Sequence, residues 1–221
     1  MIIKIKINTP KKTNEICESL SPKIILGKFM HINDSSWKTN NGKKLIFFLG
    51  AGFCPYCAAG RWAIVEGLRK FGEWKELIEN HSASTNEKFL NIATFDFSHS
   101  KYESSFGEFR GIEIADRDSK AKEKLEKIDK EILGTYNPDH LIPFLLIDGQ
   151  FMQFRTGINP ESLEKLNHEE IRKIIRDENS VVGKSIIDES NIIASLICKS
   201  IDNIPENIKD KQIIELFYKI K

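Results

Sequence analysis

The sequence has almost no excess charge of either sign, because 33 lysine and arginine residues stand against 32 aspartate and glutamate residues, for a formal net charge of +1. The two signs are mixed along the chain, so no broad positive field would attract phosphates or anionic lipids. Nucleic acid is therefore not an expected partner. Hydrophobic residues make up 40% of the chain, which is typical of a folded globular protein.

Long hydrophobic runs are also missing. Nowhere do about 18 apolar residues follow one another without charges, so no membrane-spanning segment is predicted. The first ten residues, MIIKIKINTP, alternate apolar and basic residues, which indicates a strand and not the unbroken apolar core of a secretory signal. We therefore expect a cytoplasmic protein that does not contact membranes.

Cysteine is scarce as well. Four cysteines are too few for the disulfide-dense scaffold of a small secreted protein. Cys54 and Cys57 stand together in GAGFCPYCAAGRW (residues 50–62) and form one candidate functional unit. Cys17 and Cys198 are most simply buried apolar thiols, and the alternative is a structural disulfide that joins them.

The C-x-x-C motif lies where a predicted strand meets a predicted helix. KKLIFFLG (43–50) is a continuous apolar run of strand length, as in a central strand buried on both faces. Apolar residues then recur at helical spacing over 55–72, where Pro55 suits the first helical position and Gly72 a C-terminal stop.

The remaining pattern predicts a mixture of strands and helices. Asp148 and Gly149 between two apolar runs predict a tight hairpin with a type I′ turn. The other predicted elements are a short helix starting near Thr13, a strand kinked at Gly27 (23–32), a strand (89–98), and helices at 73–80, 119–133, 160–177, 185–199 and 207–220.

Redox chemistry is the function that the motif favours. A helix N-terminus lowers the pKa of a thiol, so Cys54 is the expected nucleophile. Cys57 returns to the same side of the helix within disulfide reach and is expected to resolve a mixed disulfide. Arg61 lies on roughly the same face, either as a group that favours the thiolate or as a solvated helix residue.

Metal binding and an inert cysteine pair are the alternatives. Structural zinc takes four ligands, and the sequence has no second C-x-x-C and no paired histidine motif. We therefore expect neither a metal nor another cofactor, with the Cys54–Cys57 disulfide itself as the redox group.

The sequence resembles thioredoxin-like proteins in three features: the order of elements, CPYC at the start of the first helix, and IPF before the hairpin. CPYC is also the usual glutaredoxin motif. The resemblance implies a cis peptide bond at Pro143 that turns the backbone of Ile142 toward the substrate. Pro55 and Tyr56 of the motif are expected to help position the same substrate. It also places Phe48 where thioredoxins carry a buried aspartate. His140 is expected either near this site or as a polar loop residue.

LGAGFCPYCAAGRWAIVEGLRKFG further resembles an archaeal family of unknown function, DUF929, over roughly residues 40–177. The signature of that family resembles GAEYCPYCAAERWA, with acidic residues where this sequence has Gly52 and Gly60. The name implies no particular substrate.

We expect an α/β protein with a thioredoxin-like fold, in which a mixed sheet is flanked by helices. The predicted domain covers 44–177, with a helical insertion at about 100–137. An N-terminal extension (1–43) precedes it, and a C-terminal helical extension (178–221) follows it.

The predicted function is that of a thiol:disulfide oxidoreductase, with protein thiols or disulfides and an upstream reductase as partners. A disulfide isomerase or oxidase is an alternative, because the sequence does not fix the reduction potential. A binding or adaptor module that depends on the terminal extensions is another. The sequence does not indicate an oligomeric state.

Overall fold

Strand β3 (Lys44–Gly50) is the centre of the fold. The computed structural model describes residues 23–32, 39 and 42–220, so the strand expected at 1–10 and the helix expected from Thr13 lie outside the described residues. Strand β3 runs parallel to one neighbour and antiparallel to the other. The sheet has six strands in the order β1 (Lys23–Leu26), β2 (Phe29–His31), β8 (Phe151–Gln153), β7 (Phe144–Ile147), β3 and β6 (Gly107–Glu113).

Alternate residues of β3 enter two different hydrophobic clusters. Ile46 and Phe48 belong to the cluster on one face of the sheet, and Leu45, Phe47 and Leu49 to the cluster on the other. A strand that is covered on both faces has to be apolar throughout, which explains the uninterrupted run in the sequence.

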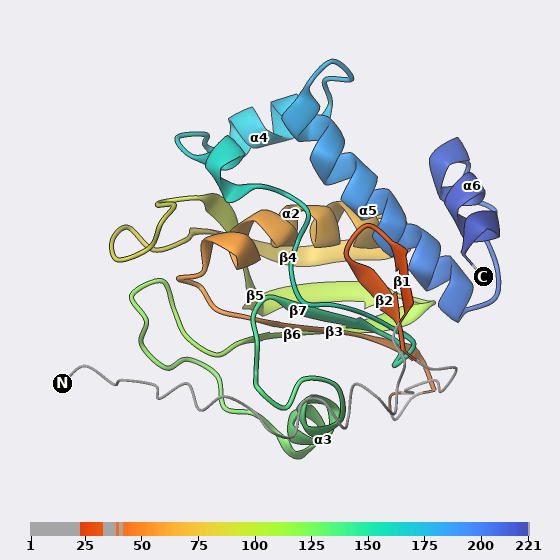
Figure 1. Cartoon of the computed structure of the whole chain (residues 1–221), viewed down its shortest axis with the longest axis horizontal. Coiled ribbons are helices and arrows are strands. Elements are labelled where there is room, and N and C mark those ends of the chain that lie inside the picture. The colour runs from red at the N-terminus through yellow and green to blue at the C-terminus, as the bar shows by residue number, and fades with distance from the viewer. Residues whose placement is uncertain (1–22, 33–38, 40–41, 221) are drawn as a thin grey trace.

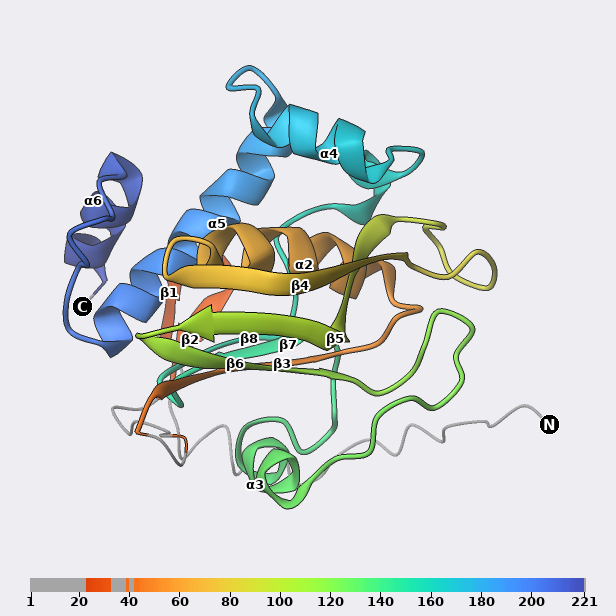
Figure 2. The ribbon, with the colours of Figure 1, turned by 180° about the vertical axis from the view of Figure 1, so that it is seen from behind.

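Helices cover the two faces of the sheet unequally (Figures 1 and 2). On one face, α2 (Pro55–Leu68) packs against α5 (Val181–Ser200), and α6 (Lys211–Lys219) packs on the outer side of α5. The short helices η1 (Pro160–Leu163) and α4 (His168–Ile175) lie beside them. The opposite face is covered by α3 (Lys127–Tyr136), which supplies Ile132 and Leu133 to the second cluster.

The segments that flank the predicted domain are parts of the same core. Strand β2 pairs with β8 and so extends the main sheet. Helix α5 contributes Ile186, Ile193 and Ala194 to the cluster that contains α2. The two predicted C-terminal helices are therefore confirmed as α5 and α6, and α5 completes the cover over α2. Within the described part of the chain, no helix combines the length and the apolar character needed to cross a membrane.

The predicted helix at 73–80 is wrong, because this segment is strand β4 (Gly72–His81), which pairs with β5 (Ala93–Ser104) in a separate two-stranded sheet. Two irregularities in the register, at Trp74/Glu76 and Glu76/Ile78, interrupt the alternation that would have marked a strand. Trp74 stacks on Phe97 of β5, and this ring contact favours the extended form. Helix α2 accordingly ends at Leu68, before Gly72.

The strands around β3 also differ from the predicted elements. The strand expected at 89–98 is β5, which lies outside the main sheet, and the strand that pairs with β3 is β6, inside the predicted helical insertion at about 100–137. The helix expected at 119–133 is limited to α3, because the amides of Lys122 and Glu123 donate to the carbonyl groups of Ile114 and Glu113 at the end of β6. Those backbone bonds hold the chain extended.

Two further elements are divided differently from the prediction. The single kinked strand at 23–32 is the hairpin of β1 and β2, which turns at Gly27 and Lys28. The helix at 160–177 is η1 followed by α4, because Asn167 and Glu170 form a capping box that starts a new helix. The turn between β7 and β8 is confirmed, since Asp148 and Gly149 have φ angles of 54° and 72°, as a type I′ turn requires.

Two glycines allow a matched test of the packing between α4 and α5. A Cβ atom at Gly183, in the first turn of α5, would lie 1.9 Å from the carbonyl oxygen of Ile174 at the end of α4, whereas a Cβ at Gly134 in α3 would meet nothing within 4 Å. Gly183→Ala should lower the free energy of unfolding by about 1–3 kcal/mol or more, because the two helix backbones would have to separate. Gly134→Ala should raise it by up to about 1 kcal/mol through helix propensity.

Urea denaturation of both variants measures the two effects. A Gly183→Ala protein with an unchanged midpoint would show that α4 and α5 are not packed this closely.

Candidate active site

Cys54 ends the loop between β3 and α2 and is the N-cap residue of α2. Its sulfur accepts a hydrogen bond from the backbone amide of Cys57 at 3.1 Å. Pro55 is the first helical residue, as predicted, so the helix loses no bond through its missing N–H. Cys54 is 7% exposed and Cys57 is fully buried, and both are free thiols. Of the two residues, only Cys54 therefore keeps partial contact with solvent.

The two thiols have opposite pKa shifts. The pKa of Cys54 is lowered because its thiolate is stabilised by the Cys57 thiol, by the amides of Cys57 and Tyr56 and by the charge of Arg61. Burial acts in the opposite direction. Burial, followed by the hydrogen bond and negative charge of Cys54, raises the pKa of Cys57 well above its ordinary value. Cys54 is thus the more easily ionised thiol of the pair, and Cys57 retains its proton to higher pH.

Arg61 is completely buried, so the interpretation of this residue as a solvated helix position is wrong. Its Nε and Nη2 atoms donate to the two carboxylate oxygens of Glu113, at 2.9 and 2.6 Å. Nη2 also donates to the carbonyl oxygen of Ala51 at 3.0 Å. The ion pair therefore joins α2, the end of β6 and the loop that leads to Cys54.

Glu113 is the residue of this site that sequence reasoning missed. It is 1% exposed, and burial raises the pKa of its carboxyl group, while Arg61 acts in the opposite direction. Asp96 of β5 lies near enough to act on it and is itself paired with Lys122. A glutamate between two isoleucines in GIEIA was the available signal, but β6 itself was not predicted.

Pro143 lies at the same end of the sheet as the cysteines. The Ile142–Pro143 peptide bond is cis. Phe144 pairs with Leu49, so Pro143 follows in register opposite Gly50, where β3 ends and the chain continues to Cys54. Ile142 is partly buried against the hydrophobic cluster that includes Cys54. His140 is an exposed loop residue, which agrees with the second of its two interpretations.

Two loops border the motif. The carbonyl oxygen of Phe53 accepts a bond from the amide of Ala83 at 3.2 Å, and the ring of Tyr56 meets that of Phe89 edge to face. Tyr56 is 41% exposed. On the other side, a Cβ atom at Gly52 would lie 2.8 Å from the Arg117 amide nitrogen, so a side chain there would displace the loop after β6.

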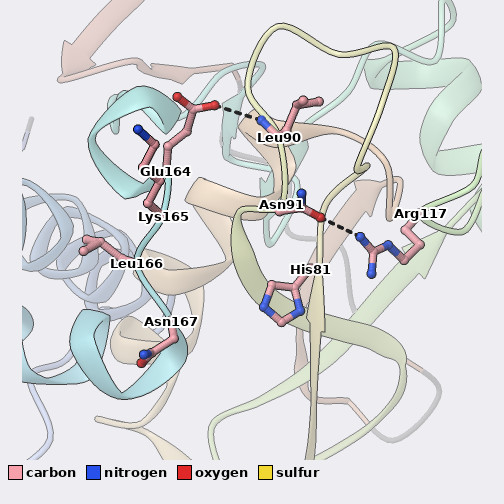
Figure 3. A pocket seen from close by; sticks show the side chains of 8 residues that line it. All are labelled: His81, Leu90, Asn91, Arg117, Glu164, Lys165, Leu166 and Asn167. Atoms are coloured by element: carbon pink, nitrogen blue, oxygen red, sulfur yellow. Dashed lines mark hydrogen bonds between the residues drawn. The ribbon is translucent and has the colours of Figure 1, made fainter.

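A pocket of about 730 Å³ opens next to these loops (Figure 3). Its wall consists of His81, Leu90, Asn91, Arg117, Glu164, Lys165, Leu166 and Asn167. Two hydrogen bonds connect its segments, from Leu90 to Glu164 at 3.0 Å and from Arg117 to Asn91 at 2.9 Å. Leu90 follows Phe89, whose ring meets that of Tyr56, so the pocket wall and the motif are linked through this loop.

The other predicted residues lie away from the motif or outside the description. Cys198 is buried in the hydrophobic core, and burial raises the pKa of its thiol to about 11. Cys17 lies outside the described residues, so the proposed link between the two remains a prediction. Phe48 is buried, and the guanidinium carbon of Arg61 lies 5.5 Å from the centre of its ring.

Residues 28–135 match the model of the family described as Domain of unknown function (DUF929). The resemblance expected from the motif is therefore confirmed, over a stretch that begins and ends earlier than the expected 40–177. The matched residues include both cysteines, Arg61 and Glu113 but not Pro143. No curated protein and no solved structure matches the chain.

The lowered pKa of Cys54 predicts a specific pH profile of alkylation. Its reaction with iodoacetamide should rise with pH around a midpoint below the value of about 8.5 for an ordinary thiol, since only the thiolate reacts. Cys57 should stay unmodified over the same range, because it is buried and its pKa is raised. Peptide mass mapping of the fully reduced protein at each pH gives both rates.

Free N-acetylcysteine under identical conditions is the reference thiol. A Cys54 midpoint at or above that of the reference would contradict the stabilisation of its thiolate.

Proposed function

We propose that this protein is a thiol:disulfide oxidoreductase that acts on protein thiols and disulfides. The observation that carries the proposal is the difference between the two cysteines. Cys54 is an N-cap residue that is 7% exposed and has a lowered pKa. Cys57 is a fully buried thiol with a raised pKa, and its backbone amide donates to the Cys54 sulfur. This is the difference that a nucleophile and a resolving group require.

The proposed cycle has two steps. The Cys54 thiolate attacks one sulfur of a substrate disulfide, which forms a mixed disulfide and releases the other substrate sulfur as a thiolate that takes up a proton. Cys57 then loses its proton and attacks the Cys54 sulfur, which releases the second substrate thiolate and forms the Cys54–Cys57 disulfide. The substrate gains two electrons that the protein loses, and an upstream dithiol reductase restores the protein.

A thioredoxin-like fold is part of this proposal. Its support is the strand order β6, β3, β7 and β8, with β3 and β6 parallel and β7 antiparallel to β3, and the motif at the start of α2. We further propose that the main chain of Ile142, next to Pro143, pairs with an extended substrate segment. Tyr56 and Pro55 would contact the same substrate, and the pocket of Figure 3 would receive its flanking residues.

Serine variants of the two motif cysteines should behave differently. Cys54→Ser should reduce the transfer of electrons from dithiothreitol to a disulfide-bonded protein to the uncatalysed background, because no nucleophile remains. Cys57→Ser should accumulate a mixed disulfide at Cys54 that non-reducing electrophoresis and mass mapping detect. Cys198→Ala, which removes a buried thiol outside the motif, is the matched control and should keep wild-type activity.

Retained turnover in Cys54→Ser would refute the role given to this residue. Thiols that resist alkylation in the native protein until a chelator is added would indicate a metal site. A Cys54→Ser/Cys57→Ser double variant that keeps full cellular function would favour the adaptor role.

A further inference from the structure

Arg61 and Glu113 form a buried ion pair at a place where apolar side chains alone would be enough to pack α2. Arg61 lies four residues after Cys57 and seven after Cys54, so one face of α2 carries both sulfurs and the guanidinium group. Its charge acts on both thiols. Because water is excluded from this site, a charge there has a stronger effect than on the surface.

One nitrogen of the guanidinium group has no partner among the described residues. Nε and Nη2 are bonded to Glu113 and Ala51, whereas Nη1 is buried and meets no hydrogen-bond acceptor in this part of the chain. The rings of Phe48 and Phe97 lie against the group and cannot replace a full hydrogen bond. An unmatched buried donor costs about 1–3 kcal/mol, so a nearby anion would be stabilised. The anion that the chemistry produces on this face is a cysteine thiolate.

Glu113 is poorly placed to act as a base. Both of its oxygens accept bonds from Arg61, and the loss of either bond would leave a charge unpaired in the core. The other titratable groups around the pair are Asp96 of β5 and Lys122 and Glu123 after β6. Lys122 pairs with Asp96, and Glu123 accepts a hydrogen bond from the Glu113 amide. Glu113 is therefore placed to balance the charge of Arg61.

We propose that the Arg61–Glu113 pair sets the reduction potential of the Cys54–Cys57 couple, with Arg61 stabilising the reduced thiolate form and Glu113 limiting that stabilisation. This inference rests on the proposed function, since it requires a reversible dithiol. In the half-reaction, the disulfide takes up two electrons and one proton to give the Cys54 thiolate and the Cys57 thiol. Any group that favours the thiolate makes the disulfide easier to reduce.

The two charges predict opposite shifts. Glu113→Gln should leave the charge of Arg61 uncompensated and shift the equilibrium toward the reduced form at least about fivefold, which corresponds to about 20 mV more positive. Arg61→Met/Glu113→Gln removes both charges without a buried unpaired one. Because Arg61 acts directly on both sulfurs, this double variant should shift the equilibrium at least about twofold toward the disulfide and raise the midpoint of Cys54 alkylation.

The experiment equilibrates each full-length protein with reduced and oxidised dithiothreitol at constant pH and counts alkylated cysteines by mass. Asp129→Asn is the matched control. The buried Asp129 of α3 accepts two hydrogen bonds from Arg110 of β6, at 2.5 and 2.8 Å, and so forms a second two-bond ion pair, on the opposite face of the sheet. It should leave the equilibrium within about twofold of the wild type.

The wild-type titration is read first. If it shows no two-electron transition, the proposed function fails before any variant is compared. If it shows one, a Glu113→Gln protein that shifts no further than Asp129→Asn overturns the role of the pair. Should Glu113→Gln fail to fold, the double variant decides, and an unchanged equilibrium and alkylation midpoint would overturn the inference.

Discussion

Helix α2 is buried on almost every side, and this burial determines what its residues can do. The sheet lies below it, α5 lies against it, and β4 and β5 flank it, so that residues such as Trp62 and Leu68 are inaccessible. A charge on such a helix needs a partner within the protein, because the loss of hydration would otherwise be prohibitive. Glu113 supplies it, which couples the position of β6 to that of the loop before Cys54.

The sequence predicts the parts of the site that depend on local signals. A continuous apolar run indicates a doubly covered strand, proline after cysteine indicates a helix start, and Asp148–Gly149 indicates a tight turn. Each of these is a property of a few consecutive residues, and each agrees with β3, α2 and the β7–β8 hairpin. The cis bond before Pro143 was implied only by resemblance, because local sequence does not determine that isomer.

The parts that the sequence does not predict depend on distant partners. Strand β4 has a helix-compatible composition and an irregular register, and its pairing with β5, together with the ring contacts of Trp74, favours the strand. The charged stretch before α3 favours a helix by propensity, but its backbone is bonded to the end of β6. Glu113 gains significance only when β6 lies next to α2. A glutamate in an unpredicted strand cannot be matched with an arginine 52 positions earlier in the chain.

The same arrangement explains how two chemically identical side chains come to have different properties. Cys54 receives amide hydrogen bonds because it caps the helix, and Cys57 lies one turn deeper, where no solvent reaches it. A buried thiol that has to lose its proton during turnover requires a compensating charge, and a surface residue could not supply it through the covering layers. Arg61 is the cation on that face of α2, and its counter-ion has both oxygens occupied. In the proposed cycle, the helix that begins at Cys54 would therefore also carry the charge that favours the second step.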